Sequence, residues 1–232
     1  SYFITYTAYT RSGPGVAIAR TEDFQSIEYL GIIMQPDDKN AALFPRKFDG
    51  NYLLLHRPVT DLTAGIWMAR SPDLANWGSH EILLPARRGG WWDANRIGLA
   101  CPPIETKRGW LLFYHGVRHN GAGVLYRVGV ALLDLENPQV CLQRGTNWLF
   151  GPEMPYELDG DVSRVVFPCG YTLEDDNETL NLYYGAADTC IGLATTTLIE
   201  VFKWLDEFGS PMVGMAAQPA EQSDHSDHKP LF

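Results

Sequence analysis

The chain has 232 residues, 45% of them hydrophobic, and its formal net charge is −10. A chain of this length buries a full core in one domain, or forms a large part of an all-β domain. Nucleic acids and anionic membranes both bind basic surfaces, so this acid-rich composition argues against either as a partner. The sequence also contains no apolar run close to the ~18 residues that a membrane-spanning helix needs.

The four cysteines are widely spaced and form no C-x-x-C motif. They are Cys101, Cys141, Cys169 and Cys190. This spacing predicts buried thiols in a reducing compartment rather than disulfides or a metal site. A cytoplasmic protein is therefore expected, and no signal peptide is visible.

Four copies of one pattern follow one another along the chain. Each begins with an aromatic and apolar strand that ends in polar or small residues, at 2–9, 52–58, 110–116 and 180–188. A loop leads to a second strand of small and apolar residues, at 15–24, 65–74, 126–135 and 190–198. The first three copies continue with an apolar stretch, at 29–34, 81–84 and 143–150. Repetition of about four strands per unit is typical of propeller blades, so the predicted fold is an all-β propeller.

The last three copies also have a strand before the aromatic one, at 41–45, 99–103 and 165–168. In a propeller this strand would line the central channel. The first copy lacks it, because the chain starts at Ser1 directly on the aromatic strand. Since an incomplete ring would expose a sheet edge, we expect earlier sequence and a parent protein of five blades, about four of them in this chain.

The C-terminal part loses the repeat. Residues 198–208 are expected to form a helix with Val201, Trp204, Leu205 and Phe208 on one face. The partial propeller is predicted to end at residue 209, followed by a flexible tail over 210–232. The Asp- and His-rich run at 224–228 is interpreted as part of that solvated tail rather than as a metal site.

The segment from Trp91 to Val117 organises the candidate site. Asp93, Asn95 and Arg96 precede one strand, and His115 ends the strand that returns after a turn at 107–109. Antiparallel strands joined by a turn bring both ends to one side, so these polar residues are expected to share one rim. The Trp91–Trp92 pair beside two glycines is predicted to lie on an exposed loop that stacks on a ligand or contacts a second copy of the chain.

On the propeller model, strand ends from different copies converge near the axis. Five residues occupy such ends: Lys39, Asn40, Arg57, Arg96 and His115. Cations that converge in this way suit an oxyanion such as phosphate. The alternative is that each cation pairs with a buried carboxylate, as in Arg57 with Asp61 or Arg96 with Asp93. For the group as a whole, anion binding is favoured.

Three further residues are candidates for contact with a sugar. Asp188 follows small residues that let a ligand approach the backbone, although it is also placed to cap a turn before Thr189. Tyr126 and Phe167 could form an apolar platform for a sugar ring, or belong to the core. Two other pairs of aspartates carry less weight: Asp73 and Asp134 are interpreted as structural turn residues, and Asp159 and Asp161 as weaker ligand candidates.

Several long motifs, in order, resemble glycoside hydrolase family 130, the β-mannoside phosphorylases and β-mannosidases that fold as five-bladed propellers. They are RIGLACPPIETKRGWLLFYHGV, YRVGVALLDLENP, GDVSRVVFPCG and LYYGAADT. The similarity runs from Ser1 to about Leu205. It implies phosphate ligands at Lys39, Asn40, Arg57, Arg96 and His115, and sugar contacts at Tyr126, Phe167 and Asp188. Lys39 stands where the family often has Arg, and Arg96 where it often has Lys.

The resemblance implies inverting phosphorolysis of a β-mannoside to mannose 1-phosphate, with inorganic phosphate as co-substrate and no metal or organic cofactor. The family's general-acid Asp lies on a strand expected upstream of Ser1. Retained positive charge without a replacing carboxylate favours phosphate over water as nucleophile, since inverting hydrolysis needs a second carboxylate. The alternatives are a β-mannosidase on the same fold and a non-catalytic glycan-binding propeller. The Trp91–Trp92 loop is a candidate contact in a homo-oligomer.

Overall fold

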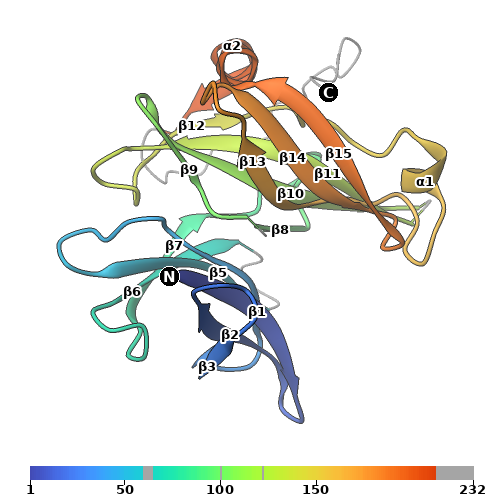
Figure 1. Ribbon diagram of the computed structural model, residues 1–232. Helices are drawn as coiled ribbons and strands as arrows, with labels where there is room; N and C mark the ends of the chain where they lie inside the picture. Colours follow the sequence, from blue (N-terminus) through green and yellow to red (C-terminus); the bar gives the residue numbers. More distant parts are fainter. Residues whose placement is uncertain (60–64, 100, 122, 213–232) are drawn as a thin grey trace. The chain divides into compact units, whose positions relative to one another are not determined.

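The computed structural model describes residues 1–59, 65–99, 101–121 and 123–212 (Figure 1). The chain divides into two compact units, which meet in the sequence between Pro85 and Ala86. Among the described residues, no helix combines the length and apolarity that crossing a bilayer requires.

The first unit contains two antiparallel sheets, each with its strands in chain order. One sheet comprises β1 (Tyr2–Thr10), β2 (Gly13–Thr21) and β3 (Ile27–Met34). The other comprises β4 (Asp38–Leu43), β5 (Tyr52–Pro58), β6 (Ile66–Ser71) and β7 (Gly78–Leu84). Leu53, Leu54 and Leu55 of β5 are fully buried, so this strand is covered on both faces, which explains its continuous apolar sequence.

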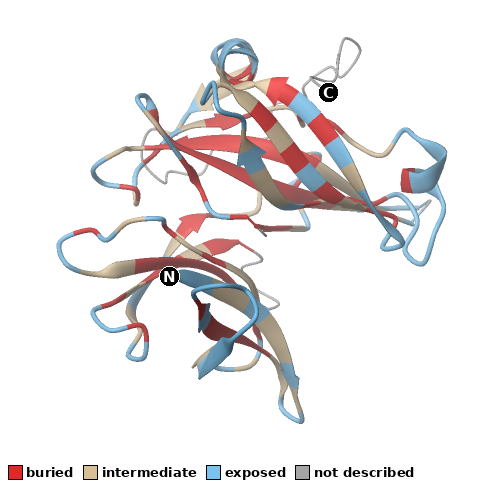
Figure 2. Ribbon diagram, viewed as in Figure 1, coloured by how far each residue is buried: buried red, intermediate tan, exposed pale blue. Residues whose placement is uncertain are grey.

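The second unit also contains two sheets. The larger comprises β8 (Arg96–Gly98), β9 (Ile104–Thr106), β10 (Gly109–Asn120), β11 (Gly123–Leu133), β12 (Cys141–Gly145) and β16 (Gly209–Pro211). The smaller comprises β13 (Val166–Leu173), β14 (Thr179–Ala186) and β15 (Cys190–Thr197). Figure 2 shows β10 as an almost continuous buried strand, and residues 109–117 are all buried. This strand forms the centre of the second unit.

The predicted strand repeat is confirmed, with one correction. The four aromatic strands are β1, β5, β10 and β14, and β4 and β13 are the preceding strands of the second and fourth copies. In the third copy the described residues 99 and 101–103 form no strand. Pro102 and Pro103 cannot donate to a ladder, and the pairing splits into two short strands instead. β8 pairs with the far end of β10 and β9 with its beginning.

The predicted C-terminal helix is present as α2 (Leu198–Phe208). The Thr197 side chain caps the N-terminus of this helix by accepting a hydrogen bond from the Glu200 amide. Val201, Trp204 and Leu205 are buried. A one-turn helix, α1 (Pro155–Leu158), was not predicted. β16 pairs with β12, so regular structure continues to Pro211. The tail was predicted over 210–232, and its part from residue 213 onward, including the run at 224–228, lies outside the described residues.

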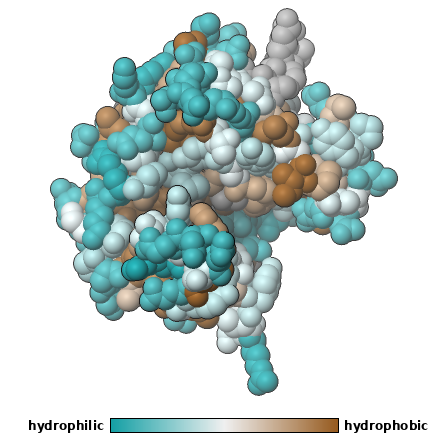
Figure 3. Space-filling model, in the orientation of Figure 1, coloured by the Kyte–Doolittle hydropathy of each residue, from teal (hydrophilic) through white to brown (hydrophobic). Residues whose placement is uncertain are grey.

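The aspartates interpreted as turn residues hold turns in the structure. Asp73 Oδ1 accepts hydrogen bonds from the amides of Ala75 and Asn76, and Asp134 Oδ1 accepts two in the same way. The hydrogen bonds, chiefly from Asn76, lower the pKa of Asp73 from 3.8 to about 2. On the face drawn in Figure 3, hydrophobic residues form separate patches among hydrophilic ones.

Candidate functional site

Two of the predicted phosphate ligands face each other across a strand pair in the first unit. Lys39 of β4 lies directly opposite Arg57 of β5 in the antiparallel register. Arg57 is only 4% exposed, and Lys39 is half-buried. Like charges at directly opposed positions repel each other, and an anion bound between them would offset that repulsion. Binding of an oxyanion by this pair stays a prediction.

Asn40 occupies a bulge beside this pair. The register shifts between Lys39 and Ala42, so that Asn40 and Ala41 together oppose the single residue His56. The φ angle of Asn40 is 55°, in the left-handed region that asparagine tolerates better than most residues. Because bulges redirect side chains, the Asn40 amide departs from the regular alternation and lies next to the cations Lys39 and Arg57.

A buried polar pair lies behind these cations and was missed by the sequence analysis. Strand alternation sends the side chains of Asp38 and His56 to the face opposite that of Lys39 and Arg57. Both are buried, and 2.6 Å separates Asp38 Oδ2 from His56 Nδ1. The signal was present in the sequence, since each residue of the pair immediately precedes a predicted phosphate ligand.

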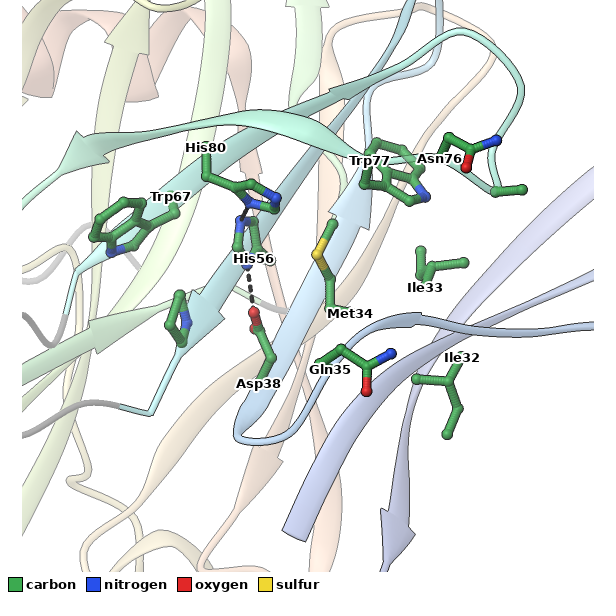
Figure 4. Close-up of a pocket in the computed structure, with 12 residues that line it drawn as sticks. Ile32, Ile33, Met34, Gln35, Asp38, His56, Trp67, Asn76, Trp77 and His80 are labelled. Carbon is green, nitrogen blue, oxygen red and sulfur yellow. Dashed lines mark hydrogen bonds and ion pairs between the residues drawn. The ribbon is translucent and has the colours of Figure 1, made fainter. Parts of the chain in front are cut away.

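His56 also faces a third polar side chain, His80 of β7. His56 Nε2 lies 3.4 Å from His80 Nδ1, and the three side chains line a cavity of about 540 Å³ together with Trp67 and Trp77 (Figure 4). Burial, followed by the nearby His56, lowers the pKa of His80 from its ordinary value. The neutral imidazole is therefore favoured at this position.

In the second unit, Arg96 and His115 lie close together on paired strands, as predicted, but His115 lies within β10, which continues to Asn120, rather than at its end. Arg96 of β8 pairs with Val117 of β10, and Gly98 pairs with His115. The Asn95 amide donates to Val117 O at 3.1 Å, and Asn95 Oδ1 accepts from the His119 amide at 2.9 Å. Asn95 thus ties the start of β8 to the end of β10.

His115 lies against the two predicted sugar-platform residues. Its ring centroid is 4.3 Å from that of Phe167 and 5.8 Å from that of Tyr126, with an interplanar angle of 29° in each case. His115 is 1% exposed, whereas Phe167 and Tyr126 are half-buried. The Tyr126 amide donates to Arg164 O, which joins β11 to the segment before β13. The structure therefore brings one predicted phosphate ligand and two predicted sugar contacts together.

Asp188 lies in the tight turn between β14 and β15. It is exposed, and both it and Ala187 have positive φ angles, of 51° and 46°. The Ala187 amide donates to Val165 O, so the turn is held beside the start of β13, two residues before Phe167. Contact between Asp188 and a sugar stays a prediction. Asp159 and Asp161 are exposed on the loop after α1.

Asp93 is held by a different set of residues from the one considered in the sequence analysis. Its Oδ2 accepts hydrogen bonds from Arg144 Nη2 at 2.7 Å, from Arg87 Nη1 at 3.1 Å and from the Tyr114 hydroxyl at 3.1 Å. The suggested pairing with Arg96 is therefore replaced by two other arginines. Burial raises the pKa of Tyr114 from 10.0 to about 12. We name this cluster of Asp93, Arg87, Arg144 and Tyr114 the Asp93 network.

The predicted exposed Trp91–Trp92 loop is wrong for Trp92. This side chain is 2% exposed, stacks on Tyr114 with centroids 5.7 Å apart, and donates from Nε1 to Thr146 O at 3.0 Å. Trp91 is half-buried, and the Arg87 guanidinium lies 4.5 Å from its ring centroid. Gly116 makes room for Trp92, because a Cβ at Gly116 would overlap the ring. The double tryptophan therefore closes over the Asp93 network.

The predicted ligands are shared between the two units. Lys39, Asn40 and Arg57 belong to the first, and Arg96 and His115 to the second. Their convergence on one anion stays a prediction. The suggested Arg57–Asp61 pairing falls on residue 61, which lies outside the described residues. Within the described ranges, no group of three or more His, Cys, Asp or Glu side chains is arranged to hold a metal ion.

Residues 1–207 match the family model of glycoside hydrolase family 130, described as β-1,4-mannooligosaccharide phosphorylase. The chain is 38% identical over 208 residues to the β-1,2-mannobiose phosphorylase of Listeria innocua, which covers 89% of this chain and 57% of that protein. It is 34% identical over 200 residues to the β-1,4-mannooligosaccharide phosphorylase of Ruminococcus albus, covering 85% of this chain and 59% of the relative. The chain thus spans less than two thirds of the length of these relatives.

The solved structure of the Listeria innocua enzyme in complex with β-1,2-mannobiose superimposes on this chain with a TM-score of 0.81, over 89% of this chain and 57% of that one. Together with the antiparallel sheets, this likeness confirms the predicted fold class, an all-β chain of the propeller type.

Proposed function

Because this chain belongs to glycoside hydrolase family 130, we propose that the protein is a glycoside phosphorylase acting on β-mannosides. The observation that carries the proposal is the match over residues 1–207, combined with relatives at 34–38% identity that are named as mannoside phosphorylases. The products would be mannose 1-phosphate and the shortened or released sugar.

The proposed phosphate ligands are Lys39, Asn40, Arg57, Arg96 and His115. The direct opposition of Lys39 and Arg57 and the bulge at Asn40 support the first three. Arg96 and His115 lie close together on the paired strands β8 and β10 of the second unit. Phosphate is a co-substrate in this proposal, and these side chains would neutralise its charge and orient it without forming a covalent bond to it.

Tyr126, Phe167 and Asp188 are the proposed sugar contacts. The half-buried rings of Tyr126 and Phe167 flank His115, so a sugar that stacks on them would lie next to a phosphate ligand. Asp188, exposed on its turn, is a hydrogen-bond acceptor for sugar hydroxyls.

The proposed reaction is a single displacement with inversion. A phosphate oxygen donates its electron pair to the anomeric carbon of the mannosyl residue, and the bond from that carbon to the glycosidic oxygen breaks. The departing oxygen takes a proton from a general acid. We propose that this acid lies in sequence outside residues 1–232. The chain's coverage of less than two thirds of the relatives supports this assignment.

The first experiment tests the nucleophile. The full-length enzyme, which would include the proposed general acid, is incubated with β-1,2- or β-1,4-mannobiose, with and without inorganic phosphate, and mannose 1-phosphate is followed by phosphorus NMR. We expect product only with phosphate, and we expect Arg57→Ala to abolish its formation. Arg20→Ala is the matched control, because Arg20 is an exposed arginine of the same unit that pairs with Glu22 and Glu28.

Two results would count against the proposal. Release of free mannose at the same rate without phosphate would identify a mannosidase. Unchanged phosphorolysis in Arg57→Ala would remove Arg57 from the ligand set.

A second experiment tests the general acid and uses residues 1–232 alone. A dinitrophenyl β-mannoside has a leaving group that departs without protonation, whereas mannobiose needs an acid. If the acid lies elsewhere, this chain should transfer mannose to phosphate from the aryl mannoside and be inactive on mannobiose. Comparable turnover of both substrates would show that the acid is among residues 1–232.

We also propose a cytoplasmic location. All four cysteines are free thiols. Cys101 and Cys141 are buried as expected, whereas the expected burial is wrong for Cys169 and Cys190, which are exposed. Exposed thiols fit a reducing compartment. Cell fractionation with an antibody against the protein would test this location.

A further inference from the structure

The two facing histidines of the first unit have a geometry that a direct hydrogen bond does not explain well. The distance of 3.4 Å between His56 Nε2 and His80 Nδ1 is longer than the ~2.7–3.2 Å of ordinary N–H hydrogen bonds. The ring centroids are 5.3 Å apart. Rings pointing straight at each other across 3.4 Å would have centroids about 5.7 Å apart, so the two rings do not point straight at each other.

Both distances agree with two imidazoles that share a metal ion. Zinc–nitrogen bonds are about 2.0–2.1 Å, so two nitrogens at a tetrahedral angle of ~109° lie about 3.3–3.4 Å apart. With about 1.2 Å from each nitrogen to its ring centre, the centroids of such a pair lie about 5.2–5.3 Å apart. The observed separations of 3.4 and 5.3 Å match this arrangement.

Asp38 supplies the outer contact that metal-binding histidines usually have. Its carboxylate lies 2.6 Å from Nδ1 of His56, and both side chains are buried. A proton on Nδ1, donated to Asp38, leaves the lone pair of Nε2 directed toward His80. Carboxylates in this position fix the tautomer and the ring orientation of a metal-ligating histidine.

The surroundings leave room for an ion and its water. The cavity of about 540 Å³ is lined by both histidines, and the side chains of Gln35 and Asn76 also border it. In Figure 4 Asp38, His56 and His80 lie in a row, with Trp67 and Trp77 on either side. His80 is exposed at the cavity, so an ion can reach it from solvent.

We propose that His56 and His80 form a binding site for a divalent transition-metal ion of the Zn²⁺, Ni²⁺ or Cu²⁺ type, with Asp38 as its outer-sphere carboxylate. Imidazole ligands suit these ions. Among the described residues no third His, Cys, Asp or Glu completes the group, so water fills the remaining positions and the ion is exchangeable. The site is separate from the proposed phosphate ligands Lys39 and Arg57, which point to the other face of β4 and β5.

The experiment uses the 232-residue chain in which His225→Ala and His228→Ala remove the other closely spaced histidines. Its accessible thiols are alkylated so that they do not bind the metal. Zn²⁺ is titrated by calorimetry, and Co²⁺ by its visible absorption. We expect saturable binding of one ion per chain, lost in His80→Ala. His119→Ala, which removes another exposed histidine, is the matched control and should bind as the parent does.

A second variant distinguishes coordination from general loss of structure. Asp38→Asn keeps the shape of the outer contact but weakens it, and should lower the metal affinity by about 10–100-fold. Circular dichroism of each variant confirms the fold. The proposal fails if the parent binds no ion, if His80→Ala binds with unchanged affinity, or if His119→Ala loses binding equally.

Discussion

Strands β5 and β10 occupy the same place in the repeat, one in each unit, and differ in how they hold their buried polar side chains. Aligned from Tyr52 and Trp110, His56 corresponds to Tyr114, and Arg57 corresponds to His115. In both strands the first residue of the pair contacts a buried aspartate, and the second is a proposed phosphate ligand. The two strands therefore share a plan, with structural support on one face and the proposed ligand on the other.

The aspartates themselves are held differently. Asp38 has one close contact, to His56, and lines a cavity. Asp93 is 0% exposed and is bound by two arginines and a tyrosine under the Trp92 ring. A closed site with a full set of charged contacts is costly to disturb, whereas a site next to a cavity can relax or admit water. The comparison predicts a descending series of effects.

The largest effect is expected for Asp93→Asn. The change leaves the guanidinium of Arg144, which is 1% exposed, and that of Arg87 without the charge that balances them. Breaking such a buried pair costs about 3–5 kcal/mol of the free energy of unfolding. Urea unfolding followed by tryptophan fluorescence should show it, because Trp92 stacks within the network. A loss below about 1 kcal/mol, the level of a surface pair, would show that the network is not closed.

A smaller effect is expected for Asp38→Asn. The amide can still accept a hydrogen bond from His56, and the neighbouring cavity admits water, so the loss should be about 1–3 kcal/mol in the same unfolding experiment. His80→Ala leaves the Asp38–His56 contact in place and serves as the control, with little change expected. If Asp38→Asn costs as much as Asp93→Asn, the contrast between an open and a closed site is wrong.

The smallest effect is expected for Asp206→Asn. Asp206 pairs with Arg108 at 2.5 Å, but both side chains are exposed, so the loss should not exceed about 1 kcal/mol. The hydrogen bond from Arg108 lowers the pKa of Asp206 below 3.8. The contribution is therefore present above pH 3.8 and lost as the pH falls through the lowered pKa of the folded state. Added salt should also shrink the difference between Asp206→Asn and the unchanged protein, and a difference that resists both salt and acid would contradict this account.

The repeat could be predicted from the sequence because strand periodicity and turn residues are local properties. The aromatic strands β1, β5, β10 and β14 and the helix α2 all fell where the pattern placed them. The rim formed by Arg96 and His115 was also predictable, since a hairpin returns the chain to its starting side.

The buried network was not predictable, because its members are distant in the sequence. Arg144 lies 51 residues from Asp93, and neither carries a local signal of pairing with the other. For Trp92, adjacent glycines indicated a loop but could not show that Gly116 and Gly129 of the neighbouring strands leave space for the ring. In β4, the bulge at Asn40 depends on pairing with β5 rather than on the sequence of β4 alone.

The close contact between Asp38 and His56 also bears on the register of β5 against β4. Slippage of β5 by one residue against β4 would exchange the faces of His56 and Arg57, together with every other side chain of the strand. The observed register places the Asp38 carboxylate 2.6 Å from the His56 imidazole. A shift of one residue would break this contact, so the contact stabilises the register of the two strands. A substitution at Asp38 or His56 could therefore displace the positive charge of Arg57 on the opposite face without altering a basic residue of that face.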